Sequence, residues 1–289
     1  MTEKNSFKPF TLRCGSRLLT YDRPVVMGIL NATADSFYDG GRYGTEKQLI
    51  DHAEAMLEDG ADIIDVGAVS TRPGAVLLSP EEEARRLSPL VAAIRRMAPD
   101  AVISVDTCFS LPARAAVEAG ADIINDISGG AFDSDMFSVV ASLSVPYILM
   151  HNPLGTRENP SGRGVEGESD LKSVVAELSQ KNSQLHRMGV ADVIIDPGFG
   201  FSKDLNQNYA LMSRLGEMKR LFPNNPLLVA LSRKSMIYRL LDTNPDDALV
   251  GTIALHAIAL IHGAQILRVH DVREARQTID IIGKMMSLQ

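Results

Sequence analysis

Residues 101–126, AVISVDTCFSLPARAAVEAGADIIND, contain the unit from which the fold can be inferred. The apolar run 102–105 predicts a buried strand, residues 111–119 have helical period, and a second apolar run follows at 123–124. Gly120 predicts a helix end in the left-handed conformation, directly before that second run. Since the runs are apolar throughout and do not alternate, they indicate parallel strands that helices cover.

The same unit recurs along the chain. Candidate strands occupy residues 25–30, 63–66, 102–105, 123–124, 146–150, 193–195, 227–230 and 266–269. Segments of helical period occupy residues 45–58, 80–97, 111–119, 134–143, 171–188, 205–221, 247–261 and 273–286. Glycine stands second in three similar quartets that each precede a strand, at residues 59–62, 119–122 and 262–265. Eight β/α units predict an α/β fold, the closed TIM (β/α)8 barrel, for which about 250 residues are typical. The alternative is a doubly wound open sheet, although no GxGxxG motif follows an early strand.

The N-terminal residues predict a small additional element. Residues 10–21, centred on Cys14-Gly15-Ser16-Arg17, have the pattern of a β-hairpin. We expect this hairpin, about residues 9–22, to cap the bottom of a barrel that occupies about residues 24–289. Residues 1–289 are therefore expected to form one domain.

Composition disfavours several classes of protein. The formal net charge is -7 and Lys and Arg form no block, which disfavours a nucleic-acid partner. Cys14 and Cys108 stand far apart and outside any CxxC spacing, so neither a disulfide framework nor a structural zinc site is expected. No stretch approaches the ~20 apolar residues of a transmembrane helix, and the N-terminus has no apolar signal region. We therefore expect a cytoplasmic protein with no membrane partner.

Polar residues follow nearly every apolar run, at the strand ends where TIM barrels hold their functional residues. Each residue alone also has a structural interpretation. Asp126 and Asp271 can be helix caps or turn residues, Asn125 can satisfy loop backbone, and His270 can be a packed neutral histidine. The joint pattern favours a binding site, because a purely structural barrel does not need charge at the end of nearly every strand.

Eight strings, in barrel order, resemble the dihydropteroate synthase family of pterin-binding TIM barrels. They are MGILNATADSFYDGG (27–41), DVGAVSTRPGA (65–75), SVDT (104–107), NDISGG (125–130), MH (150–151), DPGFGFSK (196–203), SRKS (232–235) and RVHDV (268–272). The resemblance implies a transferase of folate biosynthesis that condenses 6-hydroxymethyl-7,8-dihydropterin diphosphate with 4-aminobenzoate and releases pyrophosphate. It also implies a homodimer and a target of sulfonamides, which mimic aminobenzoate.

The resemblance implies a pterin site. Asp196 would meet the guanidine-like edge of the pterin with paired hydrogen bonds. Asp106 and Asn125 would hold other polar atoms of the ring. Lys234 would donate to the ring carbonyl and a ring nitrogen, and Met150 would pack near the ring plane.

The resemblance also implies a diphosphate site. Asn31 would lie beside a Mg²⁺ ion, the expected cofactor, and Thr71, Arg268 and His270 would bind phosphate oxygens. Departure of pyrophosphate to leave a resonance-stabilised pterin cation, in an SN1-like reaction, is chemically reasonable. Catalysis would then consist of stabilising the departing negative charge. The expected catalytic residues are Asn31, Arg72, Lys234, Arg268 and His270.

The 4-aminobenzoate site is expected to combine two loops with a helix start, where donors suit its carboxylate. Its residues would be Phe37, Thr71, Arg72, Pro73, Arg233 and Ser235. Ala34 stands where the family commonly has proline, and Val69 stands where an acidic residue often precedes the Ser-Thr-Arg-Pro string. In the loop 152–167, the charged residues Arg157, Glu158 and Arg163 are interpreted as solvated.

Two other functions stay open from the sequence. A pterin-binding methyltransferase domain shares the barrel, but methyl transfer has no diphosphate to neutralise, so the strings SRKS and RVHD favour the synthase. A catalytically silent pterin-binding barrel is compatible with Ala34 and Val69, whereas Asn31, Arg268 and His270 argue against it.

Overall fold

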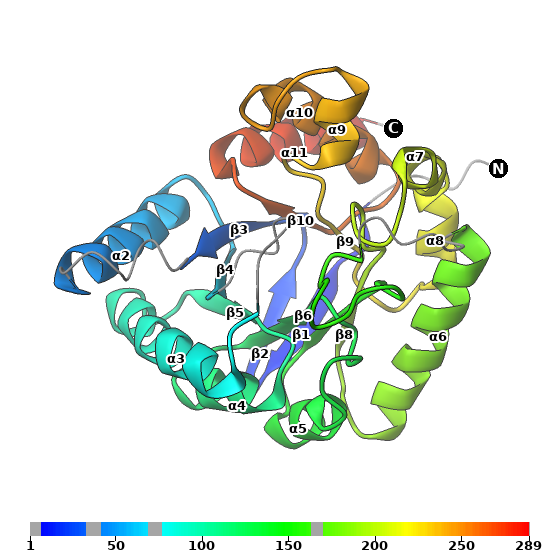
Figure 1. Ribbon diagram of the computed structural model, residues 1–289. Helices are drawn as coiled ribbons and strands as arrows, with labels where there is room; N and C mark the ends of the chain where they lie inside the picture. The colour runs from blue at the N-terminus through cyan, green and yellow to red at the C-terminus, as the bar shows by residue number, and fades with distance from the viewer. Residues whose placement is uncertain (1–6, 33–41, 69–76, 163–169, 289) are drawn as a thin grey trace.

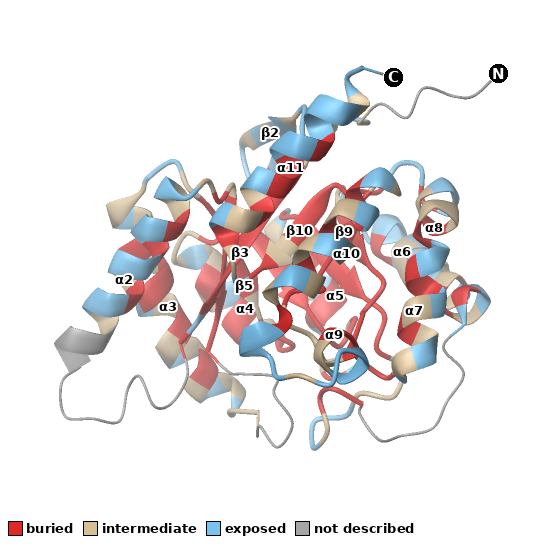
Figure 2. Cartoon of the chain, turned by 90° about the horizontal axis from the view of Figure 1, so that it is seen from above, coloured by how far each residue is buried: buried red, intermediate tan, exposed pale blue. Residues whose placement is uncertain are grey.

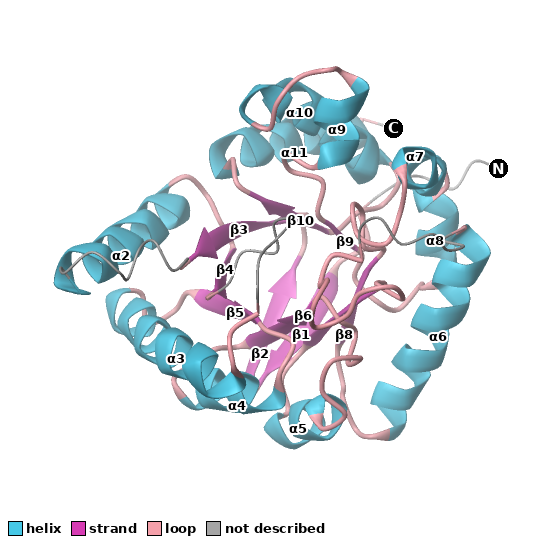
Figure 3. Cartoon of the chain, viewed as in Figure 1, coloured by secondary structure: helices cyan, strands magenta, loops and turns pink. Residues whose placement is uncertain are grey.

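The computed structural model describes residues 7–32, 42–68, 77–162 and 170–288. A sheet of eight parallel strands lies at the centre of a ring of helices (Figure 1, Figure 3). The strands are β3 Val25–Asn31, β4 Ile63–Gly67, β5 Val102–Asp106, β6 Ile123–Asp126, β7 Tyr147–Met150, β8 Val193–Asp196, β9 Leu228–Val229 and β10 Ile266–Val269. This arrangement confirms the predicted TIM barrel.

The sheet closes on itself. Its strands are hydrogen-bonded in the order β8-β7-β6-β5-β4-β3-β10-β9. The two ends of this order also meet, because Ile195 and Leu227 form a parallel bridge. Beside that bridge the Ile195 N–H donates to the Pro226 carbonyl oxygen at 2.9 Å. An open doubly wound sheet would leave these two edges apart, so that alternative is wrong.

The helices follow the predicted series with one break. They are α2 Arg42–Glu58, α3 Pro80–Met97, α4 Ser110–Glu118, α5 Met136–Leu143, α6 Leu171–Arg187, α7 Leu205–Ser213, α8 Leu215–Leu221, α9 Ser235–Leu240, the 3-10 turn η1 Asp246–Ala248, α10 Leu249–Ile261 and α11 Val272–Met286. The single helix predicted over 205–221 is wrong, because the chain leaves helical geometry at Arg214, with φ -110° and ψ 13°. Apolar periodicity cannot show this break, since Leu211 and Met218 on its two sides pack into the same core. None of the described helices has the length and apolarity needed to cross a membrane.

The N-terminal hairpin closes one end of the barrel, as predicted. β1 Phe10–Cys14 pairs with the antiparallel strand β2 Arg17–Tyr21. Leu12 and Cys14 join an apolar cluster with the first inward-facing residues of the barrel strands. Leu12 is fully buried, and burial of such a side chain typically stabilises by ~1.5–3 kcal/mol. Figure 2 shows the buried residues concentrated on the central strands.

The glycine quartets end helices as predicted. Gly60, Gly120 and Gly263 have φ angles of 98°, 115° and 92°. Asp122 of the second quartet accepts a hydrogen bond from the Ile103 N–H at 2.9 Å. This bond ties the turn that leads into β6 to the neighbouring strand β5, so the quartet fixes both the helix end and the entry of the next strand.

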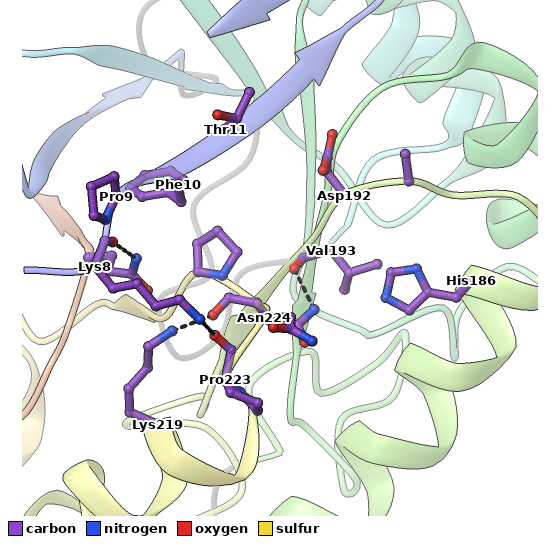
Figure 4. Close-up of a pocket in the computed structure, with 14 residues that line it drawn as sticks. Lys8, Pro9, Phe10, Thr11, His186, Asp192, Val193, Lys219, Pro223 and Asn224 are labelled. Carbon is purple, nitrogen blue, oxygen red and sulfur yellow. Dashed lines mark hydrogen bonds between the residues drawn. The ribbon is translucent and has the colours of Figure 1, made fainter. Parts of the chain in front are cut away.

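A pocket of about 560 Å³ lies beside the hairpin, where the chain enters β8, β9 and β10 (Figure 4). Two lysines that line the pocket donate hydrogen bonds to backbone carbonyl oxygens. Lys8 Nζ donates to that of Pro223 at 2.6 Å, and Lys219 Nζ donates to that of Asn225 at 2.7 Å. Burial, with the charge of Lys8 adding to it, lowers the pKa of Lys219 to about 8. The Lys8 bond ties the segment before β1 to the loop after α8, at the end of the barrel away from the polar strand ends.

Candidate active site

Inward-facing side chains are apolar at one end of the barrel and mostly polar at the other. Near the hairpin they are apolar, and the cluster includes Val25, Ile63, Val102, Ile123, Ile148, Ile194, Leu228 and Ile266. Because side chains alternate between the two faces of a strand, further inward positions follow at steps of two residues. At these positions lie Asp65, Ser104, Asn125, Met150, Asp196 and Arg268, which we call the inner polar layer. Four predicted site residues are therefore in one layer, with Asp106 and Asn31 further toward the mouth.

Arg268 lies between two carboxylates. Its Nε donates to Asp65 Oδ2 and its Nη2 to Asp106 Oδ2, both at 2.7 Å. Asn125 Nδ2 donates to the same Asp65 oxygen at 3.0 Å. The structure thus gathers Asp106, Asn125 and Arg268 around Asp65, for which the sequence pattern predicts no role.

The charges of this group affect one another. Burial raises the pKa of Asp106 to about 7, while Arg268 opposes the rise and Asp65 adds to it. Burial lowers the pKa of Arg268, but Asp65 and Asp106 more than offset that effect, so the pKa lies above its usual value. Arg268 therefore stays cationic, whereas burial makes Asp106 take up a proton more readily than an exposed aspartate does.

Asp196, at the end of β8, is held by the turn that follows it. Its Oδ1 accepts a hydrogen bond from the Gly198 N–H at 2.7 Å. Burial raises the pKa of Asp196, and the charge of Lys234 and the Gly198 N–H oppose this rise. Gly198 has φ 70°, and a Cβ atom there would lie 2.0 Å from the His151 carbonyl oxygen. Only glycine fits this turn, which fixes the direction of the Asp196 carboxylate.

Lys234 reaches the same turn from the start of α9. Its Nζ donates to the Phe199 carbonyl oxygen and lies 4.6 Å from the centroid of the Phe201 ring. The loop after β8 therefore places an ammonium group where its charge favours the ionised form of Asp196.

Met150 contributes an apolar surface beside these charges. It is 2% exposed and lies in a small cluster with Cys108, Phe109, Ile127, Phe132 and Phe201. Because Phe201 also contacts Lys234, this cluster adjoins the polar groups. The arrangement suits a flat ring whose plane packs on apolar side chains and whose edge meets carboxylates.

His270 is exposed and paired with Ser232. Its Nδ1 lies 3.0 Å from Ser232 Oγ, and its backbone N–H donates to the same oxygen at 3.2 Å. The interpretation as a packed histidine is therefore wrong. Since Ser232 Oγ accepts from that backbone N–H, its own proton can go to Nδ1, which leaves the proton of the neutral ring on Nε2.

Arg233 is in the left-handed conformation, with φ 53°. Its Nε and Nη2 donate to the two carboxylate oxygens of Asp271 at 2.9 and 2.7 Å. Asp271 stands at the N-cap of α11 as expected, but its side chain makes no cap bond and binds Arg233 instead. Ser235 is the first residue of α9. A role of Arg233 at aminobenzoate would require its guanidinium to leave Asp271, and that role stays a prediction.

The two loops that are expected to contribute to the aminobenzoate site lie mostly outside the described residues. Outside the described residues lie Ala34, Phe37, Val69, Thr71, Arg72 and Pro73. Asn31 is described: it is exposed at the end of β3 and pairs in register with Gly67 of β4. Among the described residues no group of three or more His, Cys, Asp or Glu side chains could hold a metal ion. A single exposed amide oxygen fits Mg²⁺, which typically has few protein ligands and is completed by substrate phosphates and water.

A half-buried lysine supports the turn after β8, although the sequence pattern predicts no role for it. Lys203 Nζ donates to the carbonyl oxygens of Gly198 and Phe201 at 3.0 and 3.1 Å and lies 3.0 Å from His151 Nδ1. Burial lowers the pKa of Lys203 to about 7 and that of His151 to about 2. The only signal in the sequence is that this lysine closes the string 196–203.

Two structural interpretations from the sequence have different outcomes. Asp126 accepts from two backbone N–H groups of the turn after β6 and from the Tyr147 hydroxyl at 2.6 Å, which confirms a turn role. Arg157 is not simply solvated, because its Nε donates to the Phe132 carbonyl at 3.0 Å and its guanidinium lies 5.0 Å from the Phe109 ring centroid. Sequence alone cannot show that this loop folds back onto the barrel.

Comparisons with known proteins agree with this geometry. A family described as "Pterin binding enzyme" matches residues 27–270. Dihydropteroate synthase of Escherichia coli strain K12 is 40% identical over 274 residues, which cover 93% of this chain and 94% of that protein. The structure of Xanthomonas albilineans dihydropteroate synthase with 4-aminobenzoic acid is similar, with a TM-score of 0.85, 36% identity and coverage of 98% and 99% of the two chains. The structure of the Yersinia pestis enzyme with a sulfonamide drug also has a TM-score of 0.85, with 36% identity and coverage of 97% and 100%.

Proposed function

The chain belongs to the dihydropteroate synthases, within the pterin-binding enzyme family, and we propose that the mouth of its barrel joins 6-hydroxymethyl-7,8-dihydropterin diphosphate to 4-aminobenzoate. The protein is a transferase that releases pyrophosphate. One observation carries the proposed site: two carboxylates, the buried Asp196 and the slightly exposed Asp106, lie with the cations Arg268 and Lys234 at the carboxyl ends of the strands.

The pterin would lie against Asn125, Met150 and Asp196. Asp196 accepts paired hydrogen bonds from the ring N–H and the exocyclic amine, because an ionised carboxylate offers two acceptor oxygens in one plane. Lys234 donates to the ring carbonyl, while Asp106 and Asn125 take the remaining polar atoms. Met150 and its apolar neighbours pack against the ring.

The diphosphate would lie above Arg268 and His270, with Thr71 as a further donor. The carbon–oxygen bond to the diphosphate breaks first, and pyrophosphate leaves with the electron pair. Arg268, His270 and Arg72 stabilise the negative charge that develops on it, which is the usual way a site accelerates such a departure. The His270 ring suits this role because it is exposed, and a neutral ring with its proton on Nε2 is compatible with its pairing with Ser232.

We propose Asn31 as the protein ligand of Mg²⁺. The ion would supply further positive charge beside the phosphate oxygens. Asn31 supplies a hard amide oxygen at the rim of the barrel and fixes the place at which the diphosphate is received.

The aminobenzoate site would lie between the two loops and the start of α9. Its residues are Phe37, Thr71, Arg72, Pro73, Arg233 and Ser235. The aryl amine is neutral at pH 7 and attacks the pterin cation directly, and the proton that it loses passes to solvent. No covalent bond to the enzyme is required, and sulfonamides would compete for this site.

We also propose a cytoplasmic homodimer that forms through the outer face of α10 and α11. Exposed apolar residues lie along one side of α10: Val250, Ala254, Ile258 and Ile261. Val250 is 78% exposed, and Ile281 and Met285 on α11 are 68% and 43% exposed. Since α10 packs on α11, neighbouring helices both contribute exposed apolar side chains to this part of the surface. Such a face suits a self-complementary contact with a second copy of the chain.

Pyrophosphate release tests the function directly. Purified protein is mixed with the pterin diphosphate and Mg²⁺, with and without 4-aminobenzoate, and the product is identified by mass. We expect pyrophosphate and dihydropteroate in equal amounts when both substrates are present. Pterin binding without product at every Mg²⁺ concentration would instead support a silent pterin-binding barrel or a methyl carrier.

A further inference from the structure

We propose that Asp65 is the positioning residue of this site, which anchors Arg268 and sets the orientation of the Asn125 amide. This inference rests on the proposed function and adds a residue that does not itself touch the substrate. It acts through two neighbours, one for the diphosphate and one for the pterin ring.

Stability does not explain why a carboxylate occupies this position. Asp65 is 0% exposed, and inward positions of a TIM barrel are usually Val, Ile or Leu. Asp65 Oδ1 and the hydroxyl of Ser104, its register partner on β5, have no hydrogen-bond partner among the described residues. A buried ion pair is often no more stable than well-packed apolar side chains of the same volume. The reason for Asp65 must therefore be sought in what it holds.

Arg268 is shared unequally between its two carboxylates. The Asp65 side chain is fully buried, whereas that of Asp106 is 11% exposed, so only Asp106 can meet a ligand. When the pterin engages Asp106, the bond from Arg268 Nη2 to that carboxylate weakens, while the bond from Nε to Asp65 remains. Asp65 thus keeps the guanidinium inside the mouth, with its Nη groups available for pyrophosphate. Without Asp65, Arg268 would pair with Asp106 alone and compete with the pterin for that carboxylate.

Asp65 also determines which side-chain atom of Asn125 can face the pterin ring. A carboxylate beside a guanidinium has only acceptors, so the Asn125 amide must turn its Nδ2 toward Asp65. Its Oδ1 is then the atom available as an acceptor for an N–H group of the pterin. If a carboxamide replaces Asp65, this constraint is lost, because a carboxamide can present either a donor or an acceptor.

The variant Asp65→Asn tests both parts while conserving volume. The matched control is Ser104→Ala, which removes the neighbouring buried polar group of the same layer but no bond to Arg268 or Asn125. The measurements are kcat and KM for the pterin diphosphate, and calorimetric affinity for pteroic acid, which has no diphosphate. We expect Asp65→Asn to lower kcat and to weaken pteroic acid binding, each by about 10- to 100-fold, the effect of one charged hydrogen bond. Ser104→Ala should stay within about twofold of wild type on both, the range of a neutral substitution.

A double-mutant comparison separates the two routes. In an Arg268→Gln background, Asp65→Asn should lower kcat no further, since it acts on kcat through Arg268, but it should still weaken pteroic acid binding through Asn125. The double variant also removes both buried charges, so it remains informative if Asp65→Asn alone does not fold. Wild-type values for Asp65→Asn, or an equal loss of kcat in both backgrounds, would overturn the assignment. Wild-type turnover measured beforehand shows separately whether the proposed function holds.

Discussion

Replacing Gly198 by alanine tests how the turn after β8 holds the pterin carboxylate. At φ 70° an alanine pays the left-handed penalty, which is ~1–2 kcal/mol. The new Cβ would also lie 2.0 Å from the His151 carbonyl oxygen, so the turn must open by about 1.4 Å or more to reach ordinary contact. That movement stretches the 2.7 Å hydrogen bond from the Gly198 N–H to Asp196 beyond useful length.

The two costs add to a measurable loss. A hydrogen bond to a charged group is worth ~1.5–3 kcal/mol, so Gly198→Ala should destabilise the protein by ~3–5 kcal/mol in total. Since 1.4 kcal/mol is a factor of ten in affinity, release of the Asp196 carboxylate should weaken pteroic acid binding by ~10- to 100-fold.

Gly189→Ala provides the matched control. Gly189 follows α6 with φ 97°, and a Cβ atom there would meet nothing within 4 Å. This variant therefore has only the free-energy cost of the left-handed conformation, and it should bind pteroic acid like wild type. Denaturant unfolding and calorimetric titration of both variants compare the two effects. If Gly198→Ala lost no more stability than Gly189→Ala and kept its affinity, the account of this turn would be wrong.

Three further predictions follow from the proposed site. Asp196→Asn should weaken pteroic acid binding by ~100-fold in calorimetry because the carboxylate is lost. Arg72→Ala should leave that affinity unchanged and lower kcat. An equal loss of affinity in both variants would contradict this division of roles. Because the pKa of Asp106 is raised to about 7 and only the ionised form is a pure acceptor, kcat/KM for the pterin diphosphate should rise with pH through about 7. A flat profile across that range would exclude Asp106 as the controlling group. Ile258→Glu should convert a dimer to monomers in light scattering, while Gln180→Glu on the exposed side of α6 should leave the dimer intact.

The barrel can be predicted because each β/α unit is specified by residues that are close together in the sequence. Apolar runs, helical period and the glycine quartets repeat along the chain, and each repeat alone indicates one β/α unit. The break at Arg214 escapes prediction because the helices on either side of it bury residues on the same face.

Only part of the site can be predicted, because some of its residues lie at strand ends and Asp65 does not. Asp106 and Asp196 are the last residues of their strands, and Asn125 and Arg268 are the last but one. Because strand ends in a barrel converge, their meeting follows from the fold. Asp65 stands inside an apolar run, and its only signal is that it is charged at an inward position. Its partner Arg268 is 203 residues away, a pairing that depends on β4 and β10 both flanking β3.

The apolar end of the barrel, which the hairpin closes, offsets the energetic cost of the inner polar layer. Burying carboxylates and a guanidinium inside a barrel costs stability, because desolvation can exceed the attraction between the charges. The amino-terminal half of the interior offsets this cost with an apolar layer that β1 seals with Leu12 and Cys14. Because water is kept from one end, all of the polar groups can be directed to the other. A substrate that carries both a flat ring and a diphosphate can then meet carboxylates and cations on converging strands. The division of the interior explains why one barrel can be both stable at its base and charged at its mouth.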